Sequence, residues 1–319
     1  MPALGPAPAP PRVLDLFAVP DDVRPLPGGQ GRSVVAGDLV LSPGRDAATQ
    51  DWLSPVLARL AVTLDRELAG DAGVLVGARR GGLVASAARG GAVRIAMPIP
   101  ARDGSWVVDG WAASRYEPDT TACTDLDVLV ATGRVLHARL AVAVTGRPVG
   151  LEARTDRWAA ADRLSWGPLD PLRQAAARHG SDLVDGWVDG LAAVDGPEGS
   201  KGSDGTDGPD GPGWAAGLGP DQLVHGDLAG NVLLDVAGTP VVIDLAPYWR
   251  PALWAEAVCV LDAVLWHDAD PAALDDWQHG SRRQAMLRAA LFRVLSEDSG
   301  SHLAADLDRR LASTRLRAH

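Results

Sequence analysis

The chain has 319 residues, of which 41 are acidic and 30 are lysine or arginine, so its formal net charge is −11. This charge argues against nucleic acid or an anionic membrane as a partner, although a local basic pocket can still hold a small anion. The apolar runs are too short to predict a transmembrane helix. The two cysteines, Cys123 and Cys259, belong to no metal-binding pattern and are typical of buried thiols. We therefore expect a cytoplasmic protein.

The N-terminal third predicts a small strand-rich region. Residues 1–12 are rich in Pro and Ala and predict a disordered tail. Residues 26–44 predict two short strands around a glycine-rich turn. Residues 49–68 have the apolar spacing of a helix, with four leucines on one face: Leu53, Leu57, Leu60 and Leu64.

A β-hairpin is predicted over residues 99–117, because Asp103-Gly104 is a turn signal between two segments rich in Trp and Val. Residues 124–143 then predict a helix with Thr124 as its N-cap. Strands therefore give way to helices at about this point.

These patterns predict two lobes, an N-terminal lobe over residues 13–115 and a C-terminal lobe over residues 116–319. Within the second lobe, residues 194–213 are almost entirely Gly, Asp, Pro and Ser, which predicts a mobile loop. Three helices are expected near the end of the chain, at residues 252–267, 281–296 and 301–316.

The stretch VHGDLAGNVLLDVAGTPVVIDL, residues 224–245, places four polar groups among apolar residues: His225, Asp227, Asn231 and Asp244. Its pattern predicts a strand, a tight loop and then a hairpin that turns at Ala237-Gly238. The hairpin should return Asp244 to Asn231, and both should lie near Asp227. Buried carboxylates are costly unless a partner or a metal compensates them.

A carboxylate and an amide oxygen suit Mg²⁺, which commonly takes few protein ligands together with substrate phosphates. Asn231 and Asp244 are therefore the candidate metal ligands. Asp227 is then available to orient an attacking hydroxyl and to accept its proton. This arrangement matches the template for phosphoryl transfer.

The stretch resembles the aminoglycoside phosphotransferase/choline kinase-like family, in which His-Gly-Asp replaces the His-Arg-Asp of protein kinases. More narrowly, HGDLAGNVLL followed by VIDLAPYWRP resembles an actinobacterial branch of this family. The resemblance implies a kinase-like fold with Asp227 as catalytic base and His225 as the structural residue of its loop. It also implies ATP and Mg²⁺ as cofactors, with Mg²⁺ on Asn231 and Asp244.

One feature of the loop departs from the family. Asn231 follows Asp227 by four residues, whereas the family has five, and Gly230 is expected to absorb the tighter turn. The alternative interpretation is an ordinary turn in which Asn231 and Asp244 cap the ends of strands.

The glycine-rich turn lies where the small lobe of such kinases covers ATP. Its backbone amides and one arginine are candidates for phosphate binding: Gly28, Gly29, Gly31 and Arg32. The resemblance also places the interlobe hinge at GWAASRYE, where Tyr116 and Glu117 are the candidates for pairing with adenine. The resemblance places Asp156 and Asp162 where such enzymes have acceptor-binding elements, but charges on a helix surface are the favoured interpretation.

The lysine that the family uses to bind ATP phosphates is replaced here by Ser42, and its acidic partner by Thr49. Lys201 is the only lysine in the chain, and it lies in the predicted mobile loop. Either an arginine binds the phosphates instead, with Arg32 favoured over Arg45, or the protein binds nucleotide poorly.

We therefore expect an α+β, two-lobed kinase-like fold with a β-rich N-terminal lobe and a mainly helical C-terminal lobe. The leading function is ATP-dependent, Mg²⁺-assisted phosphoryl transfer to a hydroxyl or amino group of a small-molecule acceptor. Two alternatives stay open, a pseudokinase that senses nucleotide or binds a partner, and a metal-dependent hydrolase that uses the same acids. The acceptor itself does not follow from the sequence.

Overall fold

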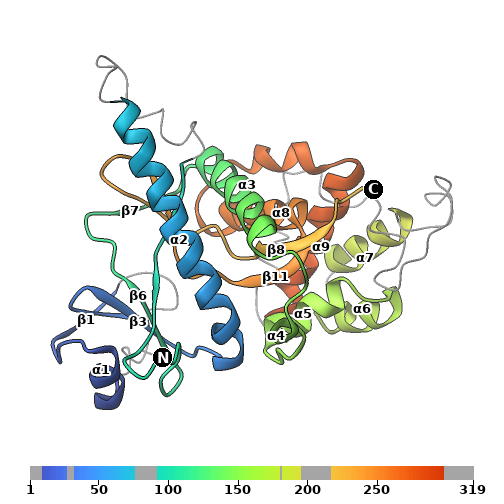
Figure 1. The fold of residues 1–319 in the computed structure, drawn as a ribbon. Helices are drawn as coiled ribbons and strands as arrows, with labels where there is room; N and C mark the ends of the chain where they lie inside the picture. Colours follow the sequence, from blue (N-terminus) through green and yellow to red (C-terminus); the bar gives the residue numbers. More distant parts are fainter. Residues whose placement is uncertain (1–8, 27–31, 76–91, 180–181, 195–216, 298–319) are drawn as a thin grey trace. The chain divides into compact units, whose positions relative to one another are not determined.

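The computed structural model describes residues 9–26, 32–75, 92–179, 182–194 and 217–297 (Figure 1). The chain is a mixture of helix and sheet, rich in sheet in its N-terminal part and helical in its C-terminal part, which confirms the predicted α+β class. It divides into two compact units. The first unit consists of Met1–Cys123, Ala138–Ala153 and Gly230–Leu245, and the second of Thr124–His137, Arg154–Ala229 and Ala246–His319.

The first unit contains a five-stranded antiparallel sheet in the order β1-β2-β3-β6-β5. Its strands are β1 (Val23–Pro25), β2 (Val34–Ala36), β3 (Leu39–Pro43), β6 (Trp111–Arg115) and β5 (Pro98–Ile99). Residues 26–44, for which two short strands were predicted, contain β2 and β3. The two strands are joined by a turn at Gly37, which has a φ of 60°.

A short helix, α1 (Pro11–Phe17), shares a hydrophobic core with this sheet. Val13 and Phe17 of the helix are buried in the same cluster as Leu41 and Trp111. Residues 9–12, which the sequence assigned to a disordered tail, are instead ordered, because Ala9 packs into this core and α1 begins at Pro11.

The long helix α2 (Ala47–Leu75) packs against β4 (Arg94–Ile95), β5 and the short helix α4 (Val149–Glu152). The four leucines predicted to share one face are all buried: Leu53, Leu57, Leu60 and Leu64. The predicted hairpin between β5 and β6 is also confirmed, with Ile99 opposite Ala113.

A second sheet of four short strands completes the first unit. Its order is β4 (Arg94–Ile95), β10 (Pro240–Val242), β9 (Val232–Leu234) and β7 (Thr121–Ala122). β9 and β10 form the predicted hairpin: the Gly238 amide donates to the Asp235 carbonyl, and Gly238 has a φ of 78°. Asn231 directly precedes β9 and Asp244 follows β10, so both residues lie at the open end of the hairpin.

The second unit is mainly helical (Figure 1). It contains α5 (Arg157–Ser165), α6 (Leu169–Ala176), α7 (Asp182–Val194), α8 (Ala252–Trp266), α9 (Gly280–Leu295), the 3₁₀ segments Ala177–His179 and Pro271–Trp277, and an antiparallel pair of strands, β8 (Asp221–His225) and β11 (Pro247–Pro251). α9 packs against α5, α7 and α8, and its residues from Gln284 to Val294 are buried. The helices predicted at 252–267 and 281–296 are confirmed as α8 and α9.

The helix α3 (Leu126–Ala143) contributes residues to both units. Its N-cap is Asp125 rather than the predicted Thr124, because the Asp125 carboxylate accepts the amides of Asp127 and Val128. The predicted helix 301–316 and, apart from Val194, the predicted loop 194–213 lie outside the described residues. In the part of the chain that the structure describes, no helix combines the length and apolar character needed to span a membrane.

Candidate active site

The His-Gly-Asp turn begins where β8 ends, and close packing explains its glycine. The Gly226 amide donates to the Ala246 carbonyl at 3.0 Å, which continues the pairing of β8 with β11. A Cβ atom at Gly226 would lie 2.4 Å from the ring of Tyr248, a distance that real side chains do not reach. Glycine is therefore required here by space.

His225 shapes this turn from inside the protein. Its side chain is fully buried, and its Nδ1 accepts the amides of Asp227 at 3.1 Å and Ala246 at 3.4 Å. The His225 amide in turn donates to Nε2 of buried His137 at 3.2 Å. Burial, and secondly the charge of His225, lowers the pKa of His137 to about 3, which suits its role as a neutral acceptor. These contacts agree with the structural role expected for His225.

The carboxylate of Asp227 is half-exposed and binds Arg293 on α9. Its Oδ1 lies 2.7 Å from Nη2 of Arg293, whose Nε also donates to Oδ1 of Asp262 at 2.8 Å. Asp262 is buried, and burial is the main cause that raises its pKa to about 7, against the opposing effect of Arg293. Burial disfavours the charge of Arg293, but the carboxylates of Asp262 and Asp227 outweigh it and raise the pKa of the guanidinium. Asp227 thus has a fixed inner oxygen contact and an outer surface open to solvent.

In the first unit, the β9–β10 hairpin brings Asn231 beside Asp244, as predicted. The Ile243 amide, next to Asp244, donates to the Asn231 carbonyl at 2.9 Å. Gly230 has a φ of 83°, so it takes up the short loop as expected. Asp244 has a φ of 47°, a left-handed conformation that is uncommon outside glycine and that recurs at functional sites.

The donor atoms near this hairpin fit a hard divalent cation. Asn231 supplies an amide oxygen, and Asp244 supplies a carboxylate whose side chain is 46% exposed. Among the described residues, no group of three or more His, Cys, Asp and Glu side chains could hold a metal by itself. An amide oxygen and a carboxylate suit Mg²⁺, which commonly takes few protein ligands together with substrate phosphates.

Asp244 also binds an arginine of the first unit. Nη1 of Arg45 lies 2.5 Å from Oδ1 of Asp244. Burial opposes the charge of Arg45, but the Asp244 carboxylate outweighs it and raises the pKa of the guanidinium. Arg45, one of the two arginines considered from the sequence, therefore binds a candidate metal ligand. Arg32, the favoured one, has an exposed side chain.

Ser42 and Thr49 stand where the family that the sequence resembles has its lysine and acid. Each of them forms a hydrogen bond with a residue nearby in the sequence. Ser42 Oγ on β3 lies 3.0 Å from Ser33 Oγ. Thr49 is buried, and both its amide and its hydroxyl donate to Asp46, at 2.8 and 2.7 Å, at the start of α2. Both side chains therefore form hydrogen bonds, but neither carries a charge that could bind phosphate.

The remaining candidates from the sequence have varied outcomes. Gly28, Gly29 and Gly31 lie outside the described residues. The Tyr116 amide donates to the Asp38 carbonyl at 2.8 Å, and the pairing of this residue with adenine stays a prediction. Only 9% of the Glu117 side chain is exposed, and its carboxylate binds Arg94 at 3.0 Å. The arrangement of Asp227 relative to Asn231 and Asp244 stays a prediction.

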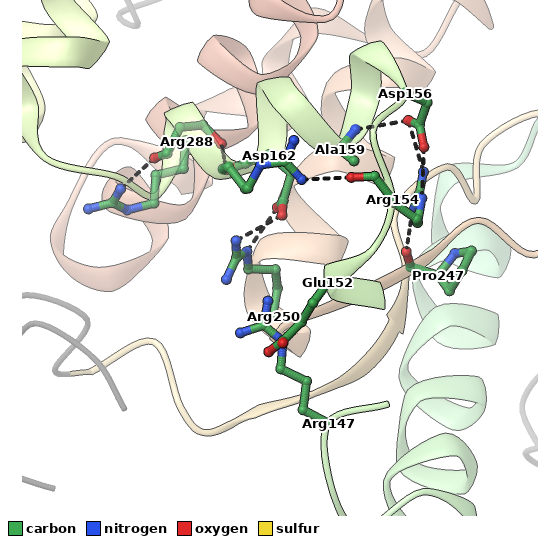
Figure 2. Close-up of polar contacts among 11 residues, drawn as sticks. Arg147, Glu152, Arg154, Asp156, Ala159, Asp162, Pro247, Arg250 and Arg288 are labelled. Atoms are coloured by element: carbon green, nitrogen blue, oxygen red, sulfur yellow. Dashed lines mark hydrogen bonds and ion pairs between the residues drawn. The ribbon is translucent and has the colours of Figure 1, made fainter. Parts of the chain in front are cut away.

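The prediction that Asp156 and Asp162 are surface charges was wrong for Asp162. Figure 2 shows Asp162 bound to Arg250 through both oxygens, each at 2.8 Å, and only 13% of the Asp162 side chain is exposed. Arg250 and Arg288 both lie over the ring of Trp166, at 4.9 and 4.8 Å from its centroid. Asp156 caps α5 by accepting the Ala159 amide at 2.9 Å and also binds Arg154. These contacts tie α5 to β11.

Three residues of the site had no signal in the sequence: His137, Asp262 and Arg293. They lie 35 to 90 residues away from the turn along the chain, outside any motif, and helical spacing assigns them only to helices. The feature that could have revealed the pair is the position of Asp262 within the apolar helix α8, where a carboxylate needs a buried partner such as Arg293 of α9.

A scan of protein-family models and a search of curated proteins each found no match to the chain. Three solved structures resemble it over most of its length. An aminoglycoside phosphotransferase from Alicyclobacillus acidocaldarius subsp. acidocaldarius is 13% identical, with a TM-score of 0.49 over 98% of this chain and 93% of that one. Choline kinase LicA from Streptococcus pneumoniae is 10% identical, with a TM-score of 0.43 over 94% and 95%.

A choline/ethanolamine kinase family protein from Mesorhizobium loti is 16% identical, with a TM-score of 0.45 over 95% of this chain and 89% of that one. By their descriptions, all three are kinases or phosphotransferases. The actinobacterial branch stays a prediction.

Proposed function

We propose that the chain is a phosphotransferase that moves the terminal phosphoryl group of ATP, with the help of Mg²⁺, to a hydroxyl or amino group of a small molecule. The observation that carries this proposal is the β9–β10 hairpin, in which the backbone hydrogen bond from the Ile243 amide to the Asn231 carbonyl brings the chain at Asn231 close to Asp244. The Asp244 side chain is 46% exposed, so its carboxylate can reach a ligand in solvent.

Each residue then has a defined task. Asp227 accepts a hydrogen bond from the acceptor hydroxyl, orients it and takes its proton as the bond to phosphorus forms and ADP leaves. Arg293 holds the Asp227 carboxylate, and His225 holds the backbone of the turn. Asn231 and Asp244 would hold Mg²⁺, which when bound neutralises charge on the phosphate oxygens.

The pseudokinase is the second candidate, and specific residues favour it. Ser42 and Thr49 supply no charge at the positions where the family has its lysine and acid, and both are held by local hydrogen bonds. A protein of this kind would bind nucleotide weakly or would bind it without turnover. The two candidates therefore differ in nucleotide affinity and in the release of ADP.

The experiment is a thermal-shift titration of the full chain with ATP, ADP and AMP, with and without Mg²⁺. The proposal predicts a rise in melting temperature with Mg·ATP that is larger than the rise with AMP, because the recognition is directed to the phosphates. A screen of hydroxyl- and amino-bearing compounds for release of ADP follows. Stabilisation by Mg·ATP without ADP release for any acceptor class favours the pseudokinase, and no stabilisation contradicts the proposal.

A further inference from the structure

We propose that Arg45 is an exchangeable counter-ion: without ligand it occupies the metal-binding oxygen of Asp244, and with a magnesium nucleotide it moves to the phosphate oxygens. This inference rests on the proposed function, because Asp244 has to be a metal ligand. It assigns to Arg45 the contact with phosphate for which the chain has no lysine on β3.

The guanidinium of Arg45 already occupies a carboxylate oxygen of Asp244. Nη1 of Arg45 lies 2.5 Å from Oδ1 of Asp244, a short charge-assisted contact. A guanidinium at this distance stands where a divalent cation would bind that oxygen. Two cations at one carboxylate oxygen repel each other, so binding of a metal there requires the guanidinium to move.

The backbone around Arg45 leaves this movement to the side chain. The Arg45 amide donates to the Gly110 carbonyl at 2.9 Å, which fixes the residue to the end of β6. The next residue, Asp46, accepts the Thr49 amide and caps α2. Arg45 is thus held on both sides, and a long side chain with several rotatable bonds extends from a fixed point.

The displaced guanidinium needs a new anion nearby. Its side chain is 24% exposed, so an unpaired charge there would be costly to leave without a partner. The phosphates that complete the coordination of Mg²⁺ on Asp244 lie next to the metal by necessity, and a guanidinium binds two phosphate oxygens well. Phosphate is therefore the anion within reach that a magnesium nucleotide brings.

The exchange predicts opposite effects of one substitution on two ligands. Arg45→Ala removes the competitor of the metal, so Mn²⁺ alone, used as a probe for the divalent cation, should bind roughly three- to tenfold more tightly. The same substitution removes a charge-assisted contact to phosphate, so Mg·ATP should bind about ten- to hundred-fold more weakly. A residue that only stabilises the fold would not produce opposite shifts.

The experiment measures both affinities on the full chain, Mn²⁺ by electron paramagnetic resonance without nucleotide and Mg·ATP by calorimetry. Arg139→Ala is the matched control, because Arg139 forms an ion pair with Glu67 at 2.6 Å in the same unit and is half-exposed. It should change neither affinity. Melting temperatures of all variants establish that each is folded.

Three results would overturn the inference. Unchanged Mn²⁺ affinity in Arg45→Ala would show that the arginine does not compete for Asp244. Unchanged Mg·ATP affinity in Arg45→Ala, or a loss in Arg32→Ala alone, would show that another cation binds the phosphates. A wild-type protein that binds no Mg·ATP would contradict the proposed function itself, and the inference with it, whereas the first two results leave that function standing.

Discussion

Oδ1 of Asp227, the proposed base, lies 2.7 Å from Nη2 of Arg293, and the same nitrogen binds the buried carboxylate of Asp262. One guanidinium therefore connects a solvent-facing carboxylate with one in the core between α8 and α9. A buried ion pair is rarely favoured for stability alone, since desolvation offsets much of its attraction. Because Arg293 also binds Asp227, we interpret the buried pair as a support that holds the Asp227 carboxylate in place.

Arg293→Met should lower the free energy of unfolding by roughly 3–5 kcal/mol, because it leaves Asp262 buried without a partner. Arg293→Met with Asp262→Leu should recover much of this loss, since apolar side chains then replace the pair. Chemical denaturation of the two single variants and the double variant measures the coupling.

The control for this pair is Arg134→Met. Arg134 binds Glu256 at 2.6 Å, but 60% of its side chain is exposed, so its loss should cost less than about 1 kcal/mol. Equal losses in Arg293→Met and Arg134→Met would contradict the importance assigned to the buried pair.

Gly226→Ala should destabilise the protein by about 1–3 kcal/mol, because its Cβ would meet the buried ring of Tyr248 at 2.4 Å. Thermal unfolding measures the effect. Gly146→Ala is the comparison, since a Cβ there meets nothing within 4 Å and should change stability by less than about 0.5 kcal/mol. A stable, unperturbed Gly226→Ala would show that the turn has room for a side chain.

Much of the fold could be predicted from local patterns. The hairpin at Gly238 and the helices α8 and α9 follow from turn chemistry and apolar periodicity, both of which depend on neighbours in sequence. The boundaries of capped elements were less certain. Thr124 and Asp125 are both good N-caps, and only the structure shows that the Asp125 carboxylate accepts the first amides of α3.

The residues of the site that belong to one sequence motif could be predicted. The contacts between residues that lie far apart in the sequence could not. Asn231 and Asp244 are joined by a hairpin that the sequence predicts. The sequence favoured Arg32 over Arg45 because Arg32 lies on the glycine-rich turn, whereas the contact of Arg45 with Asp244 joins residues about 200 positions apart and has no local signal. The role of Asp162 was missed for the same reason, since its partner Arg250 lies 88 residues later.

His137 should make stability depend on pH. Its pKa in the folded protein is about 3, mainly because it is buried, and an unfolded histidine has a pKa of about 6.5. As the pH falls, the unfolded chain takes up the proton first. The stability from neutral His137 is therefore complete above pH of about 6.5 and is lost between that pH and about 3, by about 1.4 kcal/mol per pH unit.

His137→Gln keeps an acceptor for the His225 amide but does not titrate in this window. The stability of the wild type relative to this variant should therefore fall by about 2 kcal/mol between pH 7 and pH 5. Urea unfolding at the two pH values measures this difference. The same difference at both pH values would contradict a neutral, buried His137.

Asp244→Ala and Asp227→Asn should separate binding from turnover. Asp244→Ala removes a ligand of the metal and should weaken Mg·ATP binding at least about tenfold, since one lost charged contact is worth roughly 1.5–3 kcal/mol. Asp227→Asn removes only the base and should leave Mg·ATP binding within a few-fold of the wild type. Calorimetric titration measures both, and a large loss of affinity in Asp227→Asn would reverse the assignment of roles.

Transfer of a labelled terminal phosphoryl group from ATP to an acceptor found in the ADP-release screen, measured for the wild type and for Asp227→Asn at saturating Mg·ATP, tests the phosphotransferase most directly. The wild type should form the labelled product, and Asp227→Asn should form it about 10²–10⁴-fold more slowly, because a general base has been removed while nucleotide binding is retained. Equal rates in the two proteins, or label released only as inorganic phosphate, would contradict transfer by this site.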